Sequence, residues 1–252
     1  MRLVLRHIAI IFLATWAQSA NAAELSKIGG VVNYVASSGT VIVNSIPVTS
    51  FAVDKYGSGG TGIDLTDWLN NGSNQITLTV KPVAAEGKAT FELKNFGSGE
   101  MLLSLTQEGA GEKSGSIEVT GIPEWAWINA TPVTPLPDSL AAAVGDLHDA
   151  YSRSDVDRII RISAAFFVDQ EKLGGLTAER FAGLLAPMLK AGTLEPLPET
   201  TITSHADDRL FRVVGSDGYP PIRVEMNDDG MKQSMRMGEW WSMINGTWQV
   251  VR

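Results

Sequence analysis

The sequence contains no cysteine in 252 residues and only three histidines. The absence of cysteine excludes disulfides, thiolate metal sites and a lipid-modified cysteine. The motifs HExxH and GxSxG do not occur either, and the glycine-rich run GSGGTG at 57–62 lacks the Lys-Ser/Thr pair of a phosphate-binding loop. We therefore expect this run to be a flexible loop, and we expect a protein that needs neither a metal nor a cofactor.

Basic side chains are scarce relative to acidic ones. The chain holds 20 Lys and Arg against 28 Asp and Glu, which gives a formal charge of −8. No cluster of five or more basic residues is present. Because nucleic acids and anionic membrane surfaces attract positively charged patches, this charge distribution argues against both as partners.

Long hydrophobic runs are missing, apart from one near the N-terminus. Arg2 and Arg6 precede the apolar run 8–17, and mostly small residues follow it up to Ala22. This order is typical of a secretory signal peptide with cleavage after Ala22, whereas a bilayer span needs roughly 20 apolar residues. We expect residues 1–22 to be removed and the mature chain to be periplasmic or secreted, with no lipid anchor and no transmembrane segment.

The remainder divides into two halves with different periodicities. Residues 23–130 contain short runs of β-forming residues separated by Gly, Ser and Asn. Apolar Ile76, Leu78 and Val80 alternate with polar residues, as in a strand that buries one face. Six or more strands at this spacing predict an all-β sandwich domain. The predicted strand regions are 31–36, 39–53, 74–83, 88–96, 100–108 and 115–122.

A proline-rich segment follows the predicted sandwich. Pro132, Pro135 and Pro137 cannot lie inside a helix or a central strand. Residues 131–138 are therefore predicted to be an extended, stiff linker between two domains. Asp138 or Ser139 is expected to cap the helix that comes next.

Residues 139–252 show helical and then strand periodicity, which predicts an α+β domain with two to three helices on a curved antiparallel sheet. Ser154 and Asp157 form a candidate capping pair, Thr177 is a candidate N-cap, and Pro187 predicts a kink. The predicted helices lie at 139–154, 154–168 and 177–192, and the predicted strand regions at 200–206, 208–216, 220–230, 231–246 and 247–252.

Two segments of the first half resemble a known family of domains. The segments GTVIVNSIPV (39–48) and GIDLTDWLNNGSNQITLTV (62–80) are similar to strand and turn segments of the galactose-binding-like jelly-roll sandwiches, such as the sugar-binding domain that precedes some glycoside hydrolases. The resemblance implies a jelly-roll-like sandwich. It implies little about a ligand, because many of these domains bind no sugar.

The matching segment also assigns structural roles to its residues. Asp64 and Thr66 are expected to start a turn, and Trp68 to plug the end of the sandwich. Gly72 and Asn74 are expected to make the bend into an edge strand. The segment is therefore interpreted as architecture rather than as a binding site.

The second half resembles a different family. The segments DLHDAYSRSDVDRIIRI (146–162) and WWSMINGTWQVVR (240–252) are similar to the first helices and the closing hairpin of the cystatin-like α+β roll named after nuclear transport factor two. In that family a curved sheet and its helices enclose a cone-shaped pocket. The resemblance implies either an isomerase- or dehydratase-like enzyme or a domain that binds a ligand or partner.

Aromatic residues supply the candidate binding site. Trp125 and Trp127 share one side of an extended chain, whereas adjacent Trp240 and Trp241 on a strand face opposite sides. One ring of the second pair is thus expected either to be a surface anchor or to be buried by another part of the protein, such as the first domain. The candidate binding residues are Trp240, Trp241, Trp125, Trp127, Tyr151 and His148.

Three functions follow from these patterns. The preferred one is an exported, non-catalytic interaction protein of a bacterial-type cell envelope, which binds a protein partner or a small apolar ligand. The first alternative is an isomerase or hydrolase in which His148 or His205 acts as a general base with a nearby aspartate, such as Asp146 or Asp207. The second is a carbohydrate-binding module in the sandwich, with an aromatic platform built from Tyr34, Tyr56 or Trp68.

Overall fold

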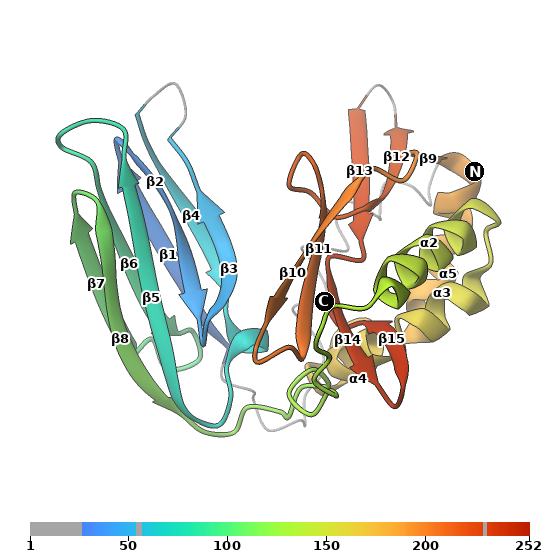
Figure 1. The fold of residues 1–252 in the computed structure, drawn as a ribbon. Coiled ribbons are helices and arrows are strands. Elements are labelled where there is room, and N and C mark those ends of the chain that lie inside the picture. The colour runs from blue at the N-terminus through green and yellow to red at the C-terminus, as the bar shows by residue number, and fades with distance from the viewer. Residues whose placement is uncertain (1–26, 54–56, 229–230) are drawn as a thin grey trace. The chain divides into compact units, whose positions relative to one another are not determined.

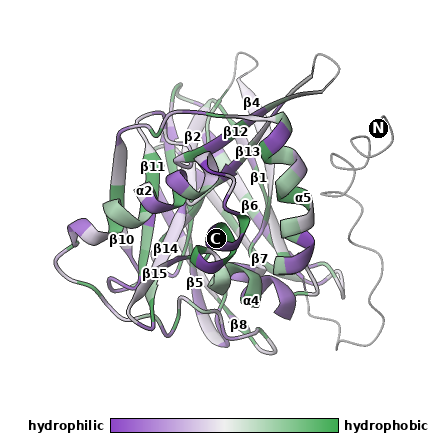
Figure 2. Ribbon diagram, turned by 90° about the vertical axis from the view of Figure 1, so that its right-hand side faces the viewer, coloured by the Kyte–Doolittle hydropathy of each residue, from purple (hydrophilic) through white to green (hydrophobic). Residues whose placement is uncertain are grey.

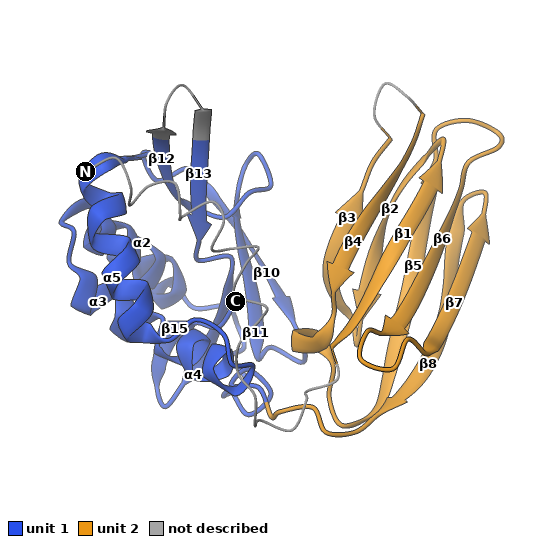
Figure 3. Ribbon diagram, turned by 180° about the vertical axis from the view of Figure 1, so that it is seen from behind, with its two compact units in different colours: residues 1–22, 125–252 blue, residues 23–124 orange. Residues whose placement is uncertain are grey.

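The structure is a computed structural model that describes residues 27–53, 57–228 and 231–252. The predicted signal peptide lies outside these residues. The chain divides into two compact units, residues 23–124 and residues 125–252 (Figure 3). Antiparallel strands in four sheets make up most of the regular structure (Figure 1). Across the described ranges, no helix is long and apolar enough to cross a membrane.

The first unit is a β-sandwich of two four-stranded sheets. One sheet has the order β4-β1-β6-β7 and the other β3-β2-β5-β8, and every pairing is antiparallel. The prediction of a sandwich with six or more strands is confirmed at this level. The strands are β1 Ile28–Val35, β2 Ser37–Val43, β3 Ile46–Phe51, β4 Ser58–Asp64, β5 Gly72–Pro82, β6 Lys88–Asn95, β7 Met101–Glu108 and β8 Gly111–Val119.

Alternation along the strands builds the core of the sandwich. Ile76, Leu78 and Val80 on β5 are buried, as predicted, while the polar residues between them are exposed or half-buried. Phe91 and Leu93 on β6 are buried in the same way from the other sheet. Sequence period 2 therefore fixes which face of each strand points inward.

The segment 62–80 mostly forms the turn that was expected. Thr66 donates its backbone N–H to Asp64 Oδ1 over 2.9 Å, and its hydroxyl accepts the N–H of Ile28 over 3.1 Å. A short 3₁₀ helix, η2 Thr66–Trp68, follows. The expectation that β5 is an edge strand is wrong, because β5 lies between β2 and β8.

The glycine-rich run 57–62 is the clearest departure from the prediction in this unit. Instead of a flexible loop it forms most of strand β4, which pairs with β1 from Ser58 to Asp64. Glycine weakens strand propensity, so the run did not look like a strand in the sequence. The long ladder with β1 outweighs that weak local preference.

The second unit contains four described helices: α2 Asp138–Ser152, α3 Val156–Ile162, α4 Ala164–Lys172 and α5 Ala178–Ala191. Thr177 caps α5 as predicted, accepting the N–H of Arg180 over 3.2 Å. The predicted caps for the first two helices are wrong: Pro137 occupies the N-cap of α2 without a side-chain bond, and Asp155, not Ser154, caps α3. Hydrophobic and hydrophilic residues both colour α5, as expected of a helix with one buried side (Figure 2).

The strands of the second unit form two sheets rather than the single curved sheet that was expected. Gly238, at φ +78, separates β13 from β14 and breaks the predicted strand 231–246. The sheet orders are β10-β11-β14-β15 and β13-β12-β9. The strands are β9 Thr193–Leu194, β10 Thr200–His205, β11 Leu210–Gly215, β12 Ile222–Asp228, β13 Met231–Met237, β14 Trp240–Ile244 and β15 Thr247–Val250.

The proline-rich segment is attached to the second unit. The N–H of Thr131 donates to the carbonyl of Met243 over 3.0 Å, and that of Val133 to the carbonyl of Asp208 over 2.9 Å. The boundary between the compact units falls at 124–125, before the predicted linker 131–138. Hydrogen bonds of the backbone hold this segment along the unit, which the proline spacing did not indicate.

Candidate functional site

The tryptophans of the second unit are core residues. Trp125 and Trp127 are 0% and 4% exposed, and Trp240 and Trp241 are 5% and 0% exposed. Of the two alternatives for the 240–241 pair, burial holds and a surface anchor does not. Whether these residues bind a partner stays a prediction, and their burial gives each of them a packing role.

Contacts within the second unit account for much of the burial of the Trp240–Trp241 pair. The Trp240 ring centroid lies 5.5 Å from that of His205 and 5.7 Å from the guanidinium carbon of Arg212. Trp241 donates its Nε1–H to the carbonyl of Gly238 over 2.7 Å. The buried indole N–H of Trp241 thus has the hydrogen-bond acceptor that burial requires.

The two residues predicted from the first helix are also engaged inside the unit. Tyr151 is buried, and burial raises the pKa of its phenol above the ordinary value of 10.0. Among the described residues its hydroxyl has no hydrogen-bond partner. His148 Nε2 lies 2.9 Å from the carbonyl oxygen of Glu195.

The aspartates proposed to orient a histidine general base form ion pairs with arginines. Asp146 forms an ion pair with Arg158 over 3.1 Å, and Asp207 one with Arg209 over 3.7 Å. His205 Nε2 lies 3.1 Å from the hydroxyl of Thr203. A general base must reach the proton that it abstracts, and its orienting acid must reach the imidazole. The acids proposed for that role lie beside arginines instead.

No metal centre is assembled in the part of the chain that the structure describes, where no group of three or more His, Asp or Glu could hold an ion. The acid of the turn 217–221 is occupied, because Arg223 donates to both carboxylate oxygens of Asp217. These hydrogen bonds, together with the N–H of Tyr219, hold the pKa of Asp217 below its ordinary value. The other acidic turn, 227–230, lies partly outside the described residues.

A buried carboxylate, Asp169, connects α4 with residue 126 and with the last residue of the chain. Asp169 is fully buried and accepts hydrogen bonds from the N–H of Ala126, from Lys172 Nζ over 2.9 Å and from Arg252 Nη1 over 3.1 Å. The Arg252 guanidinium carbon also lies 5.1 Å from the centre of the Trp125 ring. The cluster therefore joins three segments of the chain, around residues 126, 169–172 and 252.

The aromatic platform that a sugar site would require is not formed by Tyr34 and Trp68. Tyr34 stacks on Phe51, with ring centroids 4.9 Å apart, near the end of β1. Trp68 follows the turn that bonds Ile28, at the beginning of β1. With about 3.3 Å per residue along a strand, the two rings belong to opposite ends of the sandwich. Tyr56, the third candidate, lies outside the described residues.

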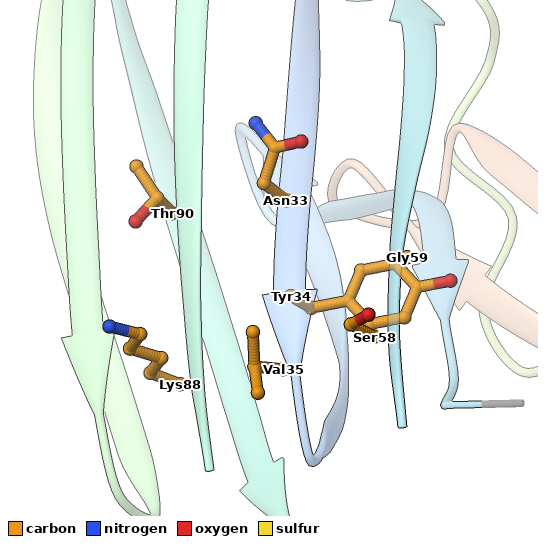
Figure 4. Close-up of a pocket in the computed structure, with 7 residues that line it drawn as sticks. All are labelled: Asn33, Tyr34, Val35, Ser58, Gly59, Lys88 and Thr90. Atoms are coloured by element: carbon orange, nitrogen blue, oxygen red, sulfur yellow. The ribbon is translucent and has the colours of Figure 1, made fainter. Parts of the chain in front are cut away.

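A depression of about 310 Å³ lies beside β4 on the first unit (Figure 4). Its walls come from three neighbouring strands, β1, β4 and β6. They combine uncharged hydrogen-bonding groups with methyl groups and one lysine. The lining residues are Asn33, Tyr34, Val35, Ser58, Gly59, Lys88 and Thr90.

Strand β4 forms the rim of this depression and the edge of its sheet. Within the described sheets its single neighbour is β1. Backbone bonds from Ala36 to Gly57 and from Leu65 to Ile28 frame the ladder between the two strands. Because bonded pairs alternate in an antiparallel ladder, the odd-numbered residues 59, 61 and 63 face β1. The even-numbered residues Ser58, Gly60, Gly62 and Asp64 turn their N–H and C=O groups outward, and we call these groups the β4 edge.

Of the two glycines of the β4 edge, Gly62 is not required by the fold of the unit, and Gly60 is constrained only by its neighbour Asn33. Neither Gly60 nor Gly62 has a positive φ. A Cβ atom at Gly62 would meet nothing within 4 Å, and one at Gly60 would meet the Asn33 side chain at 3.1 Å. By contrast, a Cβ at Gly39 on β2 would lie 2.0 Å from a backbone oxygen. Glycine in a strand without such a constraint often marks a place where another backbone approaches.

The other three edges of the two sandwich sheets carry features that block an added strand. Leu103 on β7 packs over Gly115 on β8, so these two edges cover each other. Strand β8 also carries Glu112 and Lys113, and β3 contains Pro47 and pairs across a bulge. Proline, charge and bulges are the devices by which natural sheets block an edge. Residues 58–63 of β4 have none of them.

Comparison with protein-family models, with curated proteins and with solved structures finds no match to this chain. The candidate site therefore depends on the geometry of the β4 edge alone. Sequence reasoning missed this edge because GSGGTG looked like a loop. The available signal was the alternation of Thr61 and Ile63 with glycine just before the recognisable turn at Asp64.

Proposed function

We propose that this protein is an exported, non-catalytic interaction protein that binds a partner polypeptide in extended conformation along the β4 edge. The observation that carries the proposal is an edge strand without protecting residues from 58 to 63, whose outward-facing Gly62 the fold itself does not require. Addition of a strand to such an edge provides affinity through main-chain hydrogen bonds. Export rests on the signal-peptide pattern of residues 1–22, and a periplasmic or extracellular location is part of the proposal.

The depression beside the edge supports the same function. An added strand would place alternate side chains over the outer face of the sheet, where Gly60 and Gly62 leave room. Asn33 lies beside this open space, because it pairs with Gly60 on β4, and Thr90 lies next to Asn33 on β6. Their amide and hydroxyl can donate to or accept from an incoming chain. Pockets of this kind supply sequence selectivity to strand addition.

The finer family assignments belong to this proposal as well. A galactose-binding-like jelly roll for the first unit is supported by the bonded turn at Asp64–Thr66 and by the buried Asn74. A nuclear-transport-factor-two-like roll for the second unit is supported by its helices, which precede the antiparallel strands in the chain. Neither assignment adds a ligand, and the small apolar ligand stays a prediction from the sequence.

The test removes one outward hydrogen-bond donor. Gly62→Pro deletes the N–H that faces away from β1 and leaves the ladder with β1 intact, since proline is tolerated in edge strands when its missing N–H faces solvent. Gly62→Ala is the matched control, because it adds only a methyl group to open space. The chain from residue 23, in all three forms, is used to capture partners from envelope extract.

We expect wild type and Gly62→Ala to retain the same partner and Gly62→Pro to lose it. Hydrogen exchange of the wild-type complex should slow at the amides of Gly60 and Gly62, which the partner strand would occupy. Thermal unfolding of the three proteins within a few degrees of one another shows that the variants fold. Identical capture by all three forms, with no protection at these amides, would contradict the proposal.

A further inference from the structure

We infer that the strand added to the β4 edge is β4 of a second copy of this chain, which runs antiparallel about a twofold axis at Thr61. The inference rests on the proposed function, because it names the partner of the same edge. Closed twofold dimers are the commonest homo-oligomers, and their interface uses one self-complementary patch twice. The geometry of β4 meets that requirement.

The positions of the outward peptide groups determine the register. Only residues 58, 60, 62 and 64 offer N–H and C=O groups at the edge. Pairing Ser58 with Asp64 of the second copy, and Gly60 with Gly62 of the second copy, uses all four positions. Thr61 then faces its own counterpart on the axis, in a pair without hydrogen bonds. Eight strands would form one continuous sheet, and neither copy would keep an open edge on this side.

The side chains along β4 are compatible with this pairing. Gly60 and Gly62 carry no side chain, so nothing obstructs the approach of the second backbone. Ser58 can donate its hydroxyl to the carboxylate of Asp64 in the second copy. Residues 58–63 are uncharged. Asp64 is the one charged residue of the paired segment, and its two copies lie at opposite ends of it. The excess of acidic over basic residues in each chain therefore acts against the dimer mainly through long-range repulsion.

These properties also predict how strongly the dimer forms. A short strand pair buries less surface than the roughly 1,600 Å² of a standard interface, so we expect association only at concentrations of about 100 µM. Added salt should strengthen the dimer, because screening reduces the repulsion between two acidic chains. An interface that depended on ion pairs would weaken with salt instead.

The absence of cysteine makes a clean crosslinking experiment possible. Thr61→Cys introduces a single thiol on the proposed axis, where the two Cα atoms of a pair without hydrogen bonds approach to about 4.5 Å, within the range of a disulfide. Thr106→Cys is the matched control, because it lies on β7, the opposite edge strand of the same sheet. Both are prepared in the chain from residue 23 and oxidised under identical conditions, and sedimentation measures the mass of the reduced proteins.

We expect Thr61→Cys to form a disulfide dimer about tenfold faster than Thr106→Cys or more, because pairing raises the effective thiol concentration toward the millimolar range. Adding Gly62→Pro should remove this advantage, whereas Gly62→Ala should preserve it. Equal rates for the two cysteines, or wild type that sediments as a monomer at about 100 µM, would overturn the inference.

The two proposals fail in distinguishable ways. A monomeric chain that still loses an envelope partner through Gly62→Pro refutes the second copy and leaves strand addition intact. A monomeric chain whose captured proteins do not respond to Gly62→Pro refutes both. The register with the axis at Thr61 would be rejected if Gly60→Cys or Gly62→Cys formed a disulfide dimer faster than Thr61→Cys does.

Discussion

The two units bury polar groups in different ways. In the sandwich the buried polar residues are neutral, and Asn74 is the centre of a local network around one turn. In the second unit a carboxylate, Asp169, is buried against Arg252 and joins segments more than 80 residues apart in the chain. The sandwich thus buries neutral polar groups, whereas the second unit buries an ionic cluster between distant segments.

Aromatic residues differ between the units in the same sense. Five of the seven tryptophans of the chain lie in residues 125–252, and all five are buried. The surface that we favour for binding lies instead on the sandwich, on strand β4, in which three of seven residues are glycine. The tryptophans therefore mark the core of the second unit. The candidate interaction site is identified instead by the outward-facing backbone groups of β4.

The largest expected effect comes from breaking the ionic cluster. Asp169→Ala removes the acceptor for Ala126 and leaves Arg252, whose side chain is 6% exposed, without its carboxylate. Removal of one partner from a buried ion pair typically costs about 3–5 kcal/mol. We expect that loss in the unfolding of the second unit, followed by tryptophan fluorescence, which reports mainly on residues 125–252.

Asp149→Ala is the control for this effect. Asp149 pairs with Arg153 over 3.6 Å on the surface of α2, where both side chains are more than half exposed. Exposed pairs contribute up to about 1 kcal/mol. A cost for Asp169→Ala as small as that of Asp149→Ala would show that the cluster does not hold the unit together.

The corresponding change in the sandwich is expected to have a smaller effect. The Asn74 side chain exchanges hydrogen bonds with both backbone groups of Asn70, with the carbonyl of Gly72 and with Asn44. Asn74→Ala should destabilise the sandwich by about 2 kcal/mol, because buried backbone groups lose their partners. Hydrogen exchange of the β5 amides measures this loss, and Gln75→Ala, at an exposed neighbouring position, should leave their protection unchanged.

Tyr151→Phe should stabilise the second unit modestly. The buried hydroxyl has no partner among the described residues, and a buried polar group left unpaired costs about 1 kcal/mol or more. Phenylalanine keeps the ring and its packing. Urea unfolding at neutral pH measures the gain, and a destabilisation of similar size would reveal a hydrogen bond or bridging water that the phenol makes.

The same variant also predicts a pH dependence. Burial raises the pKa of Tyr151 in the folded protein above 10.0, so the folded state holds this proton more tightly than the unfolded state does. The corresponding stability is complete below pH 10 and declines as the pH rises further. Tyr151→Phe should therefore lose less stability than wild type above pH 10. Parallel pH profiles would contradict this assignment.

The smallest expected effect sharpens the comparison at the β4 edge. Gly62→Thr should stabilise the sandwich by about 0.5–1 kcal/mol, since it replaces an unconstrained glycine with a strand-forming residue. Gly39→Ala is the contrasting variant, because its methyl group would collide with the carbonyl of Thr79 and should destabilise. A destabilising Gly62→Thr would show that the fold itself requires this glycine.

Local periodicity made much of the fold predictable. The alternation around Ile76 identified β5, Thr177 marked the start of α5, and the turn at Asp64–Thr66 formed as expected. Each of these features depends on residues within one or two turns or strands of the chain. The weak strand signal of 57–62 was misread because its pairing partner, β1, lies more than 20 residues away.

The candidate site was much less predictable than the fold. The strand pattern did not predict whether Trp240 is exposed, because its burial depends on neighbours from another strand, such as His205 and Arg212. Likewise, Asp169 gave no signal in the sequence, since its partners at 126 and 252 are brought to it only by folding. An edge is a property of a whole sheet, and its order cannot be inferred from one strand.

The sequence by itself determined the β-rich first half, the helices of the second, the absence of thiol chemistry and the acidic charge, because these follow from composition and from periods of 2 and 3.6 residues. Tertiary structure alone decided that β5 is central, that the tryptophans are core and that β4 is an open edge. The physical reason is that burial and strand order arise from contacts between residues far apart in the chain, and local propensity carries no information about those contacts.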